Sequence, residues 1–183
     1  EVALGLREQP VVPKAKAVSA RAAELVLEGG TPVLEEEPSE AYPFVTVQLP
    51  IYNELYVIER LIDAVAAFDS PRDRFEIHVL DDSTDETVEV VRKRVAHYQA
   101  QGVNIRQVRR NKRQGYKAGA LRDAMEMAEG EFIAIFDADF LPPKDFLLKT
   151  LPYFKDEEIG LVQTKWEHLN KNYNVLTRLL GMA

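Results

Sequence analysis

The sequence has no cysteine, a single tryptophan and three histidines among its 183 residues. The absence of cysteine excludes disulfide bonds and thiol chemistry. The histidines, His78, His97 and His168, have no metal-ligand spacing to one another, so we expect them to be structural or exposed. No apolar run approaches the roughly 18 to 20 residues that a membrane-spanning helix requires, and the amino-terminal residues lack the pattern of a signal peptide. The chain as given is therefore expected to be soluble.

Several catalytic signatures are also missing. The sequence has no Gly-x-Ser-x-Gly elbow, Walker loop or strand-to-helix Gly-x-Gly-x-x-Gly motif, which disfavours hydrolase, ATPase and dinucleotide oxidoreductase functions. The formal net charge of −7 argues against a nucleic-acid partner, because binding to a phosphate backbone requires a dominant basic surface. An acidic protein that binds an anionic ligand should instead carry a local basic cluster.

The chain divides into two regions of different composition. Residues 1–42 contain prolines, glycines and the acidic run Glu35-Glu36-Glu37, with one helical candidate over 14–28, and we interpret them as an extension or linker. Residues 43–183 have a regular pattern and are expected to form one domain. A content of 46% hydrophobic residues is enough for one substantial core.

The second region alternates between strands and helices. Runs typical of strands cover 44–49, 75–80, 103–108, 132–136 and 159–163, and helical periodicity covers 54–68, 84–100, 117–128 and 146–154. Because strands that alternate with helices form βαβ units, the sequence predicts an α/β fold with a mostly parallel, Rossmann-like sheet and helices on both faces. Ligands of such sheets bind at the carboxyl ends of the strands.

Two carboxylates follow the most apolar of these strands. Asp137-Ala138-Asp139 comes directly after residues 132–136. Side chains at i and i+2 of an extended segment point the same way, so the two carboxylates converge. A divalent cation, or a phosphate that such a cation brings, would offset their repulsion. Taken alone, the pair could equally be aspartates that accept hydrogen bonds from turn amides.

Polar residues also follow three other strands, at the same edge of the predicted sheet. These are Pro50-Ile51-Tyr52-Asn53-Glu54, Asp81-Asp82-Ser83 and the basic stretch 109–117. The carboxylates of Asp81 or Asp82 could accept hydrogen bonds from a base or a ribose. Four polar strand ends at one edge are harder to explain by turn chemistry than one.

Some residues at these ends allow more than one interpretation. Tyr52 could be a stacking platform for a nucleobase or a partly buried loop aromatic. Ser83 and Glu86 have the spacing of a capping box for the second helix of the domain. Asn53 could cap the first helix.

The positive charge of this acidic chain is concentrated between residues 109 and 117. Arg109, Arg110 and Lys112 are expected to form a solvated basic loop. Lys117 lies at the predicted start of a helix, between two glycines that let a ligand approach the backbone closely. Helix amino termini favour anions, so we expect Lys117 to contact a phosphate.

In their order and spacing, residues 50–54, 81–83, 115–120 and 137–139 closely resemble the amino-terminal half of a family 2 glycosyltransferase with a GT-A fold. Within that family the chain is most similar to the processive branch of cellulose synthases and glucomannan (β-mannan) synthases. The segment 162–170, followed by Leu176-Thr177-Arg178, resembles the mannan-synthase-like members. The resemblance covers about residues 43–180 and leaves out the first forty.

The resemblance implies a nucleotide-sugar donor. Tyr52 and Glu54 would flank the uracil or guanine and the ribose. Asp82, with Asp81 behind it, would contact the base. The donor would be of the UDP-glucose or GDP-mannose type.

The resemblance also implies a diphosphate and a metal at the other end of the site. Lys117 would contact the diphosphate, Asp137 the ribose or phosphate side, and Asp139 a Mg²⁺ or Mn²⁺ ion. The ion would neutralise charge on the departing nucleoside diphosphate. The family reaction inverts the anomeric centre and would extend a β-linked polysaccharide on a glycan acceptor.

Two motifs of the family are missing from the sequence. These are the Thr-Glu-Asp-type segment that supplies the general base and the Gln-x-x-Arg-Trp motif that holds the acceptor. The sheet also looks truncated, so we expect the chain to be an inactive donor-binding half. The full-length protein would be embedded in a membrane with this site on the cytoplasmic face. Trp166 is interpreted as a core aromatic or an acceptor contact.

Two other functions remain as alternatives. A non-catalytic nucleotide-sugar-binding module would keep the same strand-end residues without transferring a sugar. A metal-dependent nucleotidyltransferase can have a similar fold, but it predicts a glycine-rich basic loop after the first strand, and residues 50–54 are not of that kind.

Overall fold

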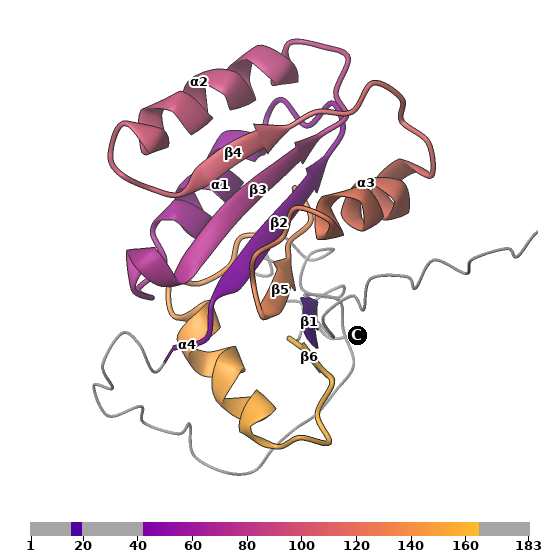
Figure 1. Ribbon diagram of the computed structural model, residues 1–183. Coiled ribbons are helices and arrows are strands. Elements are labelled where there is room, and N and C mark those ends of the chain that lie inside the picture. The colour runs from indigo at the N-terminus through magenta and orange to yellow at the C-terminus, as the bar shows by residue number, and fades with distance from the viewer. Residues whose placement is uncertain (1–15, 20–41, 165–183) are drawn as a thin grey trace, which may run out of the picture.

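The computed structural model describes residues 16–19 and 42–164 (Figure 1). Their strands form one sheet in the order β4-β3-β2-β5-β1-β6, and all of its strand pairs are parallel. The strands are β1 (Lys16–Ser19), β2 (Val45–Ile51), β3 (Phe75–Asp81), β4 (Ile105–Val108), β5 (Phe132–Ile135) and β6 (Leu161–Gln163). The five strands predicted from the sequence are all present.

Helices connect these strands as the alternating pattern predicts. The α-helices are α1 (Ile58–Ala66), α2 (Thr87–Gln99), α3 (Tyr116–Met125) and α4 (Phe146–Thr150). Two short 3-10 helices, η2 (Arg72–Arg74) and η3 (Leu151–Lys155), complete the set. Within the described part of the chain, no helix combines the length and apolarity needed to cross a bilayer.

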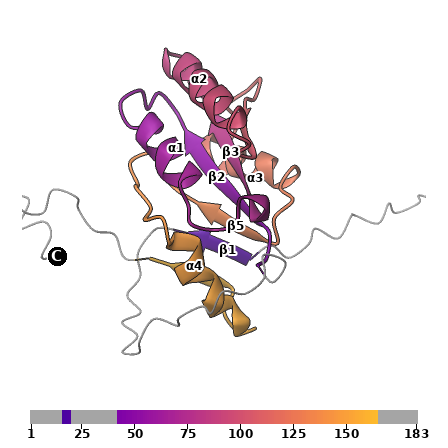
Figure 2. The ribbon, with the colours of Figure 1, turned by 90° about the vertical axis from the view of Figure 1, so that its left-hand side faces the viewer.

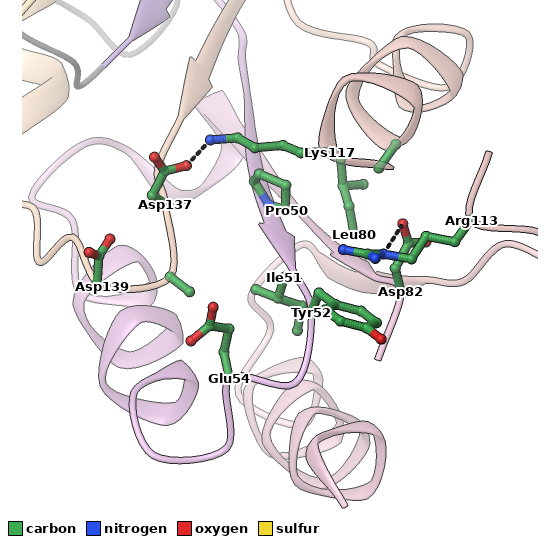
Figure 3. A pocket seen from close by; sticks show the side chains of 12 residues that line it. Pro50, Ile51, Tyr52, Glu54, Leu80, Asp82, Arg113, Lys117, Asp137 and Asp139 are labelled. Carbon is green, nitrogen blue, oxygen red and sulfur yellow. Dashed lines mark hydrogen bonds and ion pairs between the residues drawn. The ribbon is translucent and has the colours of Figure 1, made fainter. Parts of the chain in front are cut away.

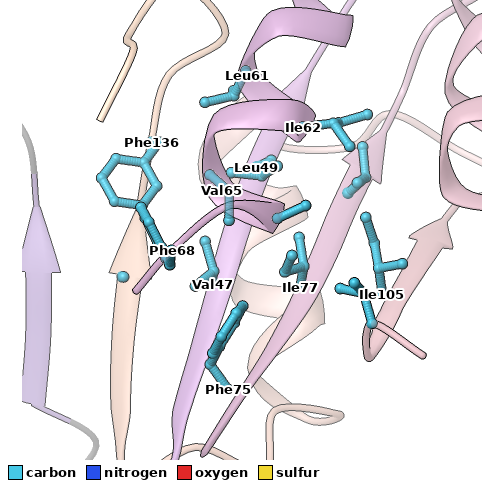
Figure 4. Packing of buried hydrophobic residues seen from close by; sticks show 14 of the residues in the cluster. Val47, Leu49, Leu61, Ile62, Val65, Phe68, Phe75, Ile77, Ile105 and Phe136 are labelled. Carbon is cyan, nitrogen blue, oxygen red and sulfur yellow. The ribbon is translucent and has the colours of Figure 1, made fainter. Parts of the chain in front are cut away.

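The helices lie on both faces of the sheet, with α1 and α3 on opposite sides (Figure 2). The larger core packs β2 and β3 against α1, α2 and α4 (Figure 4). Among its fully buried members are Val47, Leu49, Leu61, Ile62, Val65 and Ile77. A smaller cluster of Leu80, Ala120 and Ala124 holds α3 on the other face. The sheet is thus covered on both sides, as a parallel sheet requires.

One local prediction is wrong. The helix expected over 14–28 is not formed at residues 16–19, which are β1, inserted between β5 and β6. The helical propensity of the lysines and alanines is overridden because strand pairing on both sides satisfies the backbone. The rest of 14–28 lies outside the described residues, as do Trp166, His168 and the segment 165–178.

A buried polar network lies at the amino ends of the strands, on the α3 face. The carboxylate of Glu76, fully buried, accepts hydrogen bonds from the Thr46 hydroxyl at 2.7 Å, the Glu129 amide at 2.9 Å and the Arg106 guanidinium at 2.6 Å. The Thr46 hydroxyl in turn accepts a hydrogen bond from the Gly130 amide at 2.8 Å. The network therefore fixes the turn that leads into β5.

His78 belongs to the same buried network. Its Nε2 atom lies 2.8 Å from Glu76 Oε2. Burial lowers the pKa of His78 below its ordinary value of 6.5, which favours the neutral imidazole at neutral pH. Burial raises the pKa of Glu76, but the Glu129 amide, the Thr46 hydroxyl and His78 together lower it by more, so this pKa lies below its ordinary value. The structural role expected for His78 agrees with this position.

Candidate functional site

A cavity of about 360 Å³ opens at the carboxyl ends of β2, β3 and β5, beside the first turn of α3 (Figure 3). Strand ends of this kind are the expected ligand-binding edge of an α/β sheet. Six of the seven residues predicted for the site line the cavity: Tyr52, Glu54, Asp82, Lys117, Asp137 and Asp139. The remaining lining is largely apolar and comes from Pro50, Ile51, Leu80, Ala120 and Ala138, with Arg113.

Asp81, the seventh predicted residue, lies behind the cavity wall. Its buried carboxylate accepts hydrogen bonds from the Ser83 amide at 2.9 Å and the Gln107 side chain at 2.7 Å. Arg109 forms an ion pair with the same carboxylate at 3.2 Å. Asp81 therefore organises the loop after β3, and Asp82 is the carboxylate that faces the cavity.

The loop that carries Asp82 is fixed by Arg110. The guanidinium binds both carboxylate oxygens of Asp82, forms an ion pair with Asp123 at 3.0 Å and donates hydrogen bonds to the carbonyls of Gln114 and Tyr116. The hydrogen bonds to Asp82 raise the pKa of Arg110 above its ordinary value. The solvated basic loop expected for Arg109 and Arg110 is therefore wrong: both arginines hold the strand ends together.

The capping predictions are also wrong, because the side chains concerned bridge two loops. The Ser83 hydroxyl accepts a hydrogen bond from the Asn53 amide at 2.9 Å, and Asn53 Oδ1 accepts one from the Thr84 amide at 2.9 Å. Asn53 has a φ of 58°, in the left-handed region that asparagine tolerates. These bonds tie the loop after β2 to the loop after β3, so Tyr52 and Asp82 are placed together.

The two helix starts differ from the predicted ones. At α2, Asp85 Oδ1 accepts a hydrogen bond from the Thr87 amide at 3.0 Å, and the capping box of Ser83 with Glu86 is not formed. At α1, the residue before the helix is Val57, and no side chain caps it. The cap residues predicted from sequence spacing are therefore wrong at both helices.

The carboxylates at the β5 end of the cavity differ in their partners. Lys117 forms an ion pair with Asp137 (Figure 3). Asp139 and Glu54 lie on the same side of the cavity, and neither carboxylate has an ion pair or side-chain hydrogen bond within residues 42–164. The cavity thus holds two unpaired acidic groups and a lysine, an environment that attracts a cation together with an anionic ligand.

The donor set fits a divalent cation that shares its ligands with a phosphate. The described residues contain no group of three or more His, Cys, Asp or Glu side chains able to hold a metal ion on their own. Mg²⁺ is typically bound by one or two carboxylates, with waters and substrate phosphates as the other ligands. Asp139 is exposed and unpaired, so it can supply such a carboxylate.

Arg113 was not predicted as a site residue. Its guanidinium carbon lies 3.4 Å from the centre of the Tyr52 ring and 4.9 Å from that of Tyr116. Its Nε atom lies 4.0 Å from Asp82 Oδ2. The sequence placed Arg113 in a basic stretch, but nothing in that stretch indicated which arginine faces the cavity.

The first turn of α3 depends on a glycine at position 119. A Cβ atom there would lie 2.0 Å from the Gln114 carbonyl oxygen and 2.9 Å from the Arg110 guanidinium. Alanine normally stabilises a helix by about 1 kcal/mol over glycine. Here the backbone clash outweighs that gain, because it cannot be relieved by moving a flexible side chain.

We therefore expect Gly119→Ala to destabilise the protein by about 1–3 kcal/mol and to lower the thermal midpoint. The matched control is Gly160→Ala, since a Cβ at Gly160 meets no atom within 4 Å. Thermal unfolding followed by circular dichroism compares the two variants. Equal midpoints would contradict the close approach of α3 to the Gln114 carbonyl.

The sequence is similar to those of known proteins. The sequence profile of "Glycosyl transferase family 2" matches residues 46–181. "Glucomannan 4-beta-mannosyltransferase 1" of Cyamopsis tetragonoloba is 43% identical over 152 residues, which cover 80% of this chain and 29% of the relative. "Probable glucomannan 4-beta-mannosyltransferase 11" of Oryza sativa subsp. japonica is 47% identical over 148 residues, which cover 78% of this chain and 26% of the relative. The chain spans little more than a quarter of these relatives' length.

The fold is also similar to those of solved structures. A mannosyltransferase from Pyrobaculum calidifontis, in complex with GDP-Man and Mn²⁺, aligns with a TM-score of 0.58 and 35% identity over 66% of this chain and 36% of that one. S. aureus TarS 1-349 in complex with UDP-GlcNAc aligns with a TM-score of 0.52 and 31% identity, over 62% and 31% of the two chains.

The fold and the position of the cavity define an α/β domain of the GT-A type. The family profile matches residues 46–181, most of the chain. The chain belongs to glycosyl transferase family 2.

Proposed function

We propose that this chain is the donor-binding part of an inverting hexosyltransferase that uses a nucleotide-diphosphate sugar and a divalent metal to extend a β-linked polysaccharide. The observation that carries the proposal is the convergence of seven acidic, basic and aromatic side chains on one cavity at the carboxyl edge of the sheet. The names of the plant relatives support a mannosyl donor, and the archaeal structure supports GDP-mannose ahead of UDP-glucose.

Tyr52 and Asp82 form the base end of the proposed site. The Tyr52 ring offers a stacking surface, which contributes about 1–3 kcal/mol per base in other proteins. The carboxylate of Asp82 keeps free lone pairs beside its bonds to Arg110 and can accept hydrogen bonds from a base. Guanine presents two neighbouring N–H groups on one edge, whereas uracil presents one between two carbonyl oxygens. This chemistry also favours a guanine nucleotide.

Lys117, Asp137 and Asp139 form the phosphate end. Lys117 would leave Asp137 and bind a phosphate oxygen, since the diphosphate as a whole carries two negative charges and attracts the ammonium group more strongly than one carboxylate does. Asp137 is then free to accept a hydrogen bond from the ribose. Asp139 would hold a Mg²⁺ or Mn²⁺ ion, which when bound would neutralise charge on the leaving nucleoside diphosphate.

None of these residues is assigned as the general base that activates the acceptor hydroxyl. Acceptor activation is attributed to groups outside the chain, and the isolated chain is expected to bind the donor without transferring sugar. In the full-length protein we place the site on the cytoplasmic face of a membrane, with a glycan acceptor. Transfer of mannose or glucose by the isolated chain would contradict this division of roles.

The test is isothermal titration of the chain with GDP and UDP, each with Mn²⁺, with Mg²⁺ and without metal. We expect metal-dependent binding that is tighter for GDP. Lys117→Ala should weaken GDP binding about tenfold or more, because hydrogen bonds to charged groups contribute about 1.5–3 kcal/mol. Lys112→Ala is the matched control, since Lys112 is exposed and does not line the cavity. A folded chain that binds neither nucleotide with metal would contradict the proposal.

A further inference from the structure

Arg113 occupies the surface on which a base would stack. Its guanidinium carbon lies over the Tyr52 ring, 3.4 Å from the ring centre, and Tyr52, Asp82 and Arg113 all line the cavity. A stacked base takes up about 3.4 Å along the stacking direction. No base therefore fits between Tyr52 and Arg113 at their present separation, and a nucleotide that uses Tyr52 has to displace the arginine.

The contacts of the segment allow Arg113 to move alone. Arg110 is the fixed point, because it binds Asp82, Asp123 and two backbone carbonyls. Arg113 has one carboxylate neighbour, Asp82, at 4.0 Å, and that carboxylate is already paired with Arg110. Residues 109–115 form no helix or strand. Arg113 can therefore rise from Tyr52 while Arg110 holds the segment in place.

The backbone on both sides of the stack is held in unusual conformations. Asn53, next to Tyr52, and Tyr116 are the two non-glycine residues with positive φ in the described part of the chain. Such conformations persist where the surrounding bonds determine them, and they cluster at ligand sites. Tyr52 is thus the platform, whereas the Arg113 side chain is held by ring contacts and by one long ion pair, to Asp82.

We propose that Arg113 is a base clamp: it covers Tyr52 when no nucleotide is bound, rises by the thickness of one base, and closes on the outer face of that base. The ligand class is a nucleoside diphosphate whose base is held between the Tyr52 ring and the Arg113 guanidinium. This inference rests on the proposed function and adds a residue that selects for a base. Arg113 would contact the base, whereas Lys117 would contact the phosphates.

The size of the expected effect follows from two opposing terms. Removing Arg113 uncovers Tyr52, which favours ligand binding by about two- to fivefold if the exposed cation–π contact is of ordinary strength. It also removes the guanidinium from the outer face of the base, which costs about thirtyfold for a desolvated cation–π contact. The loss outweighs the gain, so the net result is weaker binding by about tenfold.

The experiment measures GDP and pyrophosphate binding to the 183-residue chain with Mn²⁺, by titration for GDP and by competition with GDP for pyrophosphate. Arg113→Ala should weaken GDP about tenfold and leave pyrophosphate within about twofold of the unsubstituted chain. Arg113→Lys should give an intermediate loss, because lysine keeps the charge but lacks the planar surface. Lys112→Ala, which removes the same charge from the same segment, should change neither ligand.

Each other outcome overturns the clamp. An equal loss of affinity for GDP and for pyrophosphate would make Arg113 a phosphate ligand. Tighter GDP binding by Arg113→Ala would mean that Arg113 only blocks the Tyr52 ring. If Arg113→Ala fails to fold, Arg113→Lys decides, since GDP affinity equal to that of the unsubstituted chain contradicts a stacking role. Failure of the unsubstituted chain to bind GDP is a different result, because it removes the proposed function itself.

Discussion

Replacing Asp139 with alanine is expected to abolish the metal-dependent part of nucleotide binding. Asp139 is exposed at the cavity and has no ion-pair partner within residues 42–164, so its carboxylate is available to a cation. Titration of GDP into Asp139→Ala should give the same affinity with and without Mn²⁺. In the full-length enzyme, turnover should fall roughly a thousandfold, about 4 kcal/mol of transition-state stabilisation, because the metal would no longer offset charge on the leaving group.

The matched control for this variant is Asp73→Ala. Asp73 is also an exposed aspartate, but it lies in η2, before the amino end of β3 and at the opposite edge of the sheet. Metal-dependent GDP binding that survives in Asp139→Ala and equals that of Asp73→Ala would remove the metal assignment. A full-length protein that loses donor affinity without ever showing turnover would favour the non-catalytic binding module.

Replacing Glu76 with alanine is expected to destabilise the fold by about 3–5 kcal/mol, because each partner left without its acceptor costs about 1–3 kcal/mol. The substitution leaves Arg106, the Thr46 hydroxyl and the Glu129 amide without their acceptor. For a chain of this size the thermal midpoint should fall by roughly 6–20 °C. Glu89→Gln is the control, since Glu89 is an exposed carboxylate on α2, and its midpoint should stay close to that of the unsubstituted protein.

The same network predicts the sign of the pH dependence. The pKa of Glu76 is lower in the folded protein than its ordinary value of 4.5, so its contribution to stability is complete above that pH and is lost as the pH falls further. The lowered pKa of His78 acts in the same direction below 6.5, because the unfolded chain takes up the proton first. Unfolding measured from pH 7 to pH 3 should show falling stability. A Glu76→Ala curve parallel to that of the unsubstituted chain would contradict the role of Glu76.

Much of the fold and of the site could be predicted because the relevant signals are local. The apolar run that ends at Phe136 and the polar residues after each strand were enough to place Tyr52, Asp82 and Asp139 at one edge. The order of strands and helices then predicted the parallel sheet. Periodicity and strand ends are properties of neighbouring residues, so a single sequence contains them.

The parts that could not be predicted depend on contacts between distant segments. Ser83 and Asn53 have good capping chemistry, yet they bond to each other across 30 positions because two loops meet. Arg110 and Arg113 are three residues apart in one basic stretch, but the first is an anchor and the second covers Tyr52. β1 is a strand because β5 and β6 flank it. None of these outcomes follows from local propensity.

The buried polar network also disfavours incorrect registers between neighbouring strands. Every residue of β2 and β3 is buried, so hydrophobicity alone distinguishes poorly between the two faces of these strands. A slip of one residue would turn Glu76 and His78 into the apolar layer beneath α1, where a carboxylate would have no partner. Misaligned sheets are thereby penalised before the strand ends can assemble. The few buried polar side chains of this domain thus help to select one strand register among several that would bury similar apolar surface.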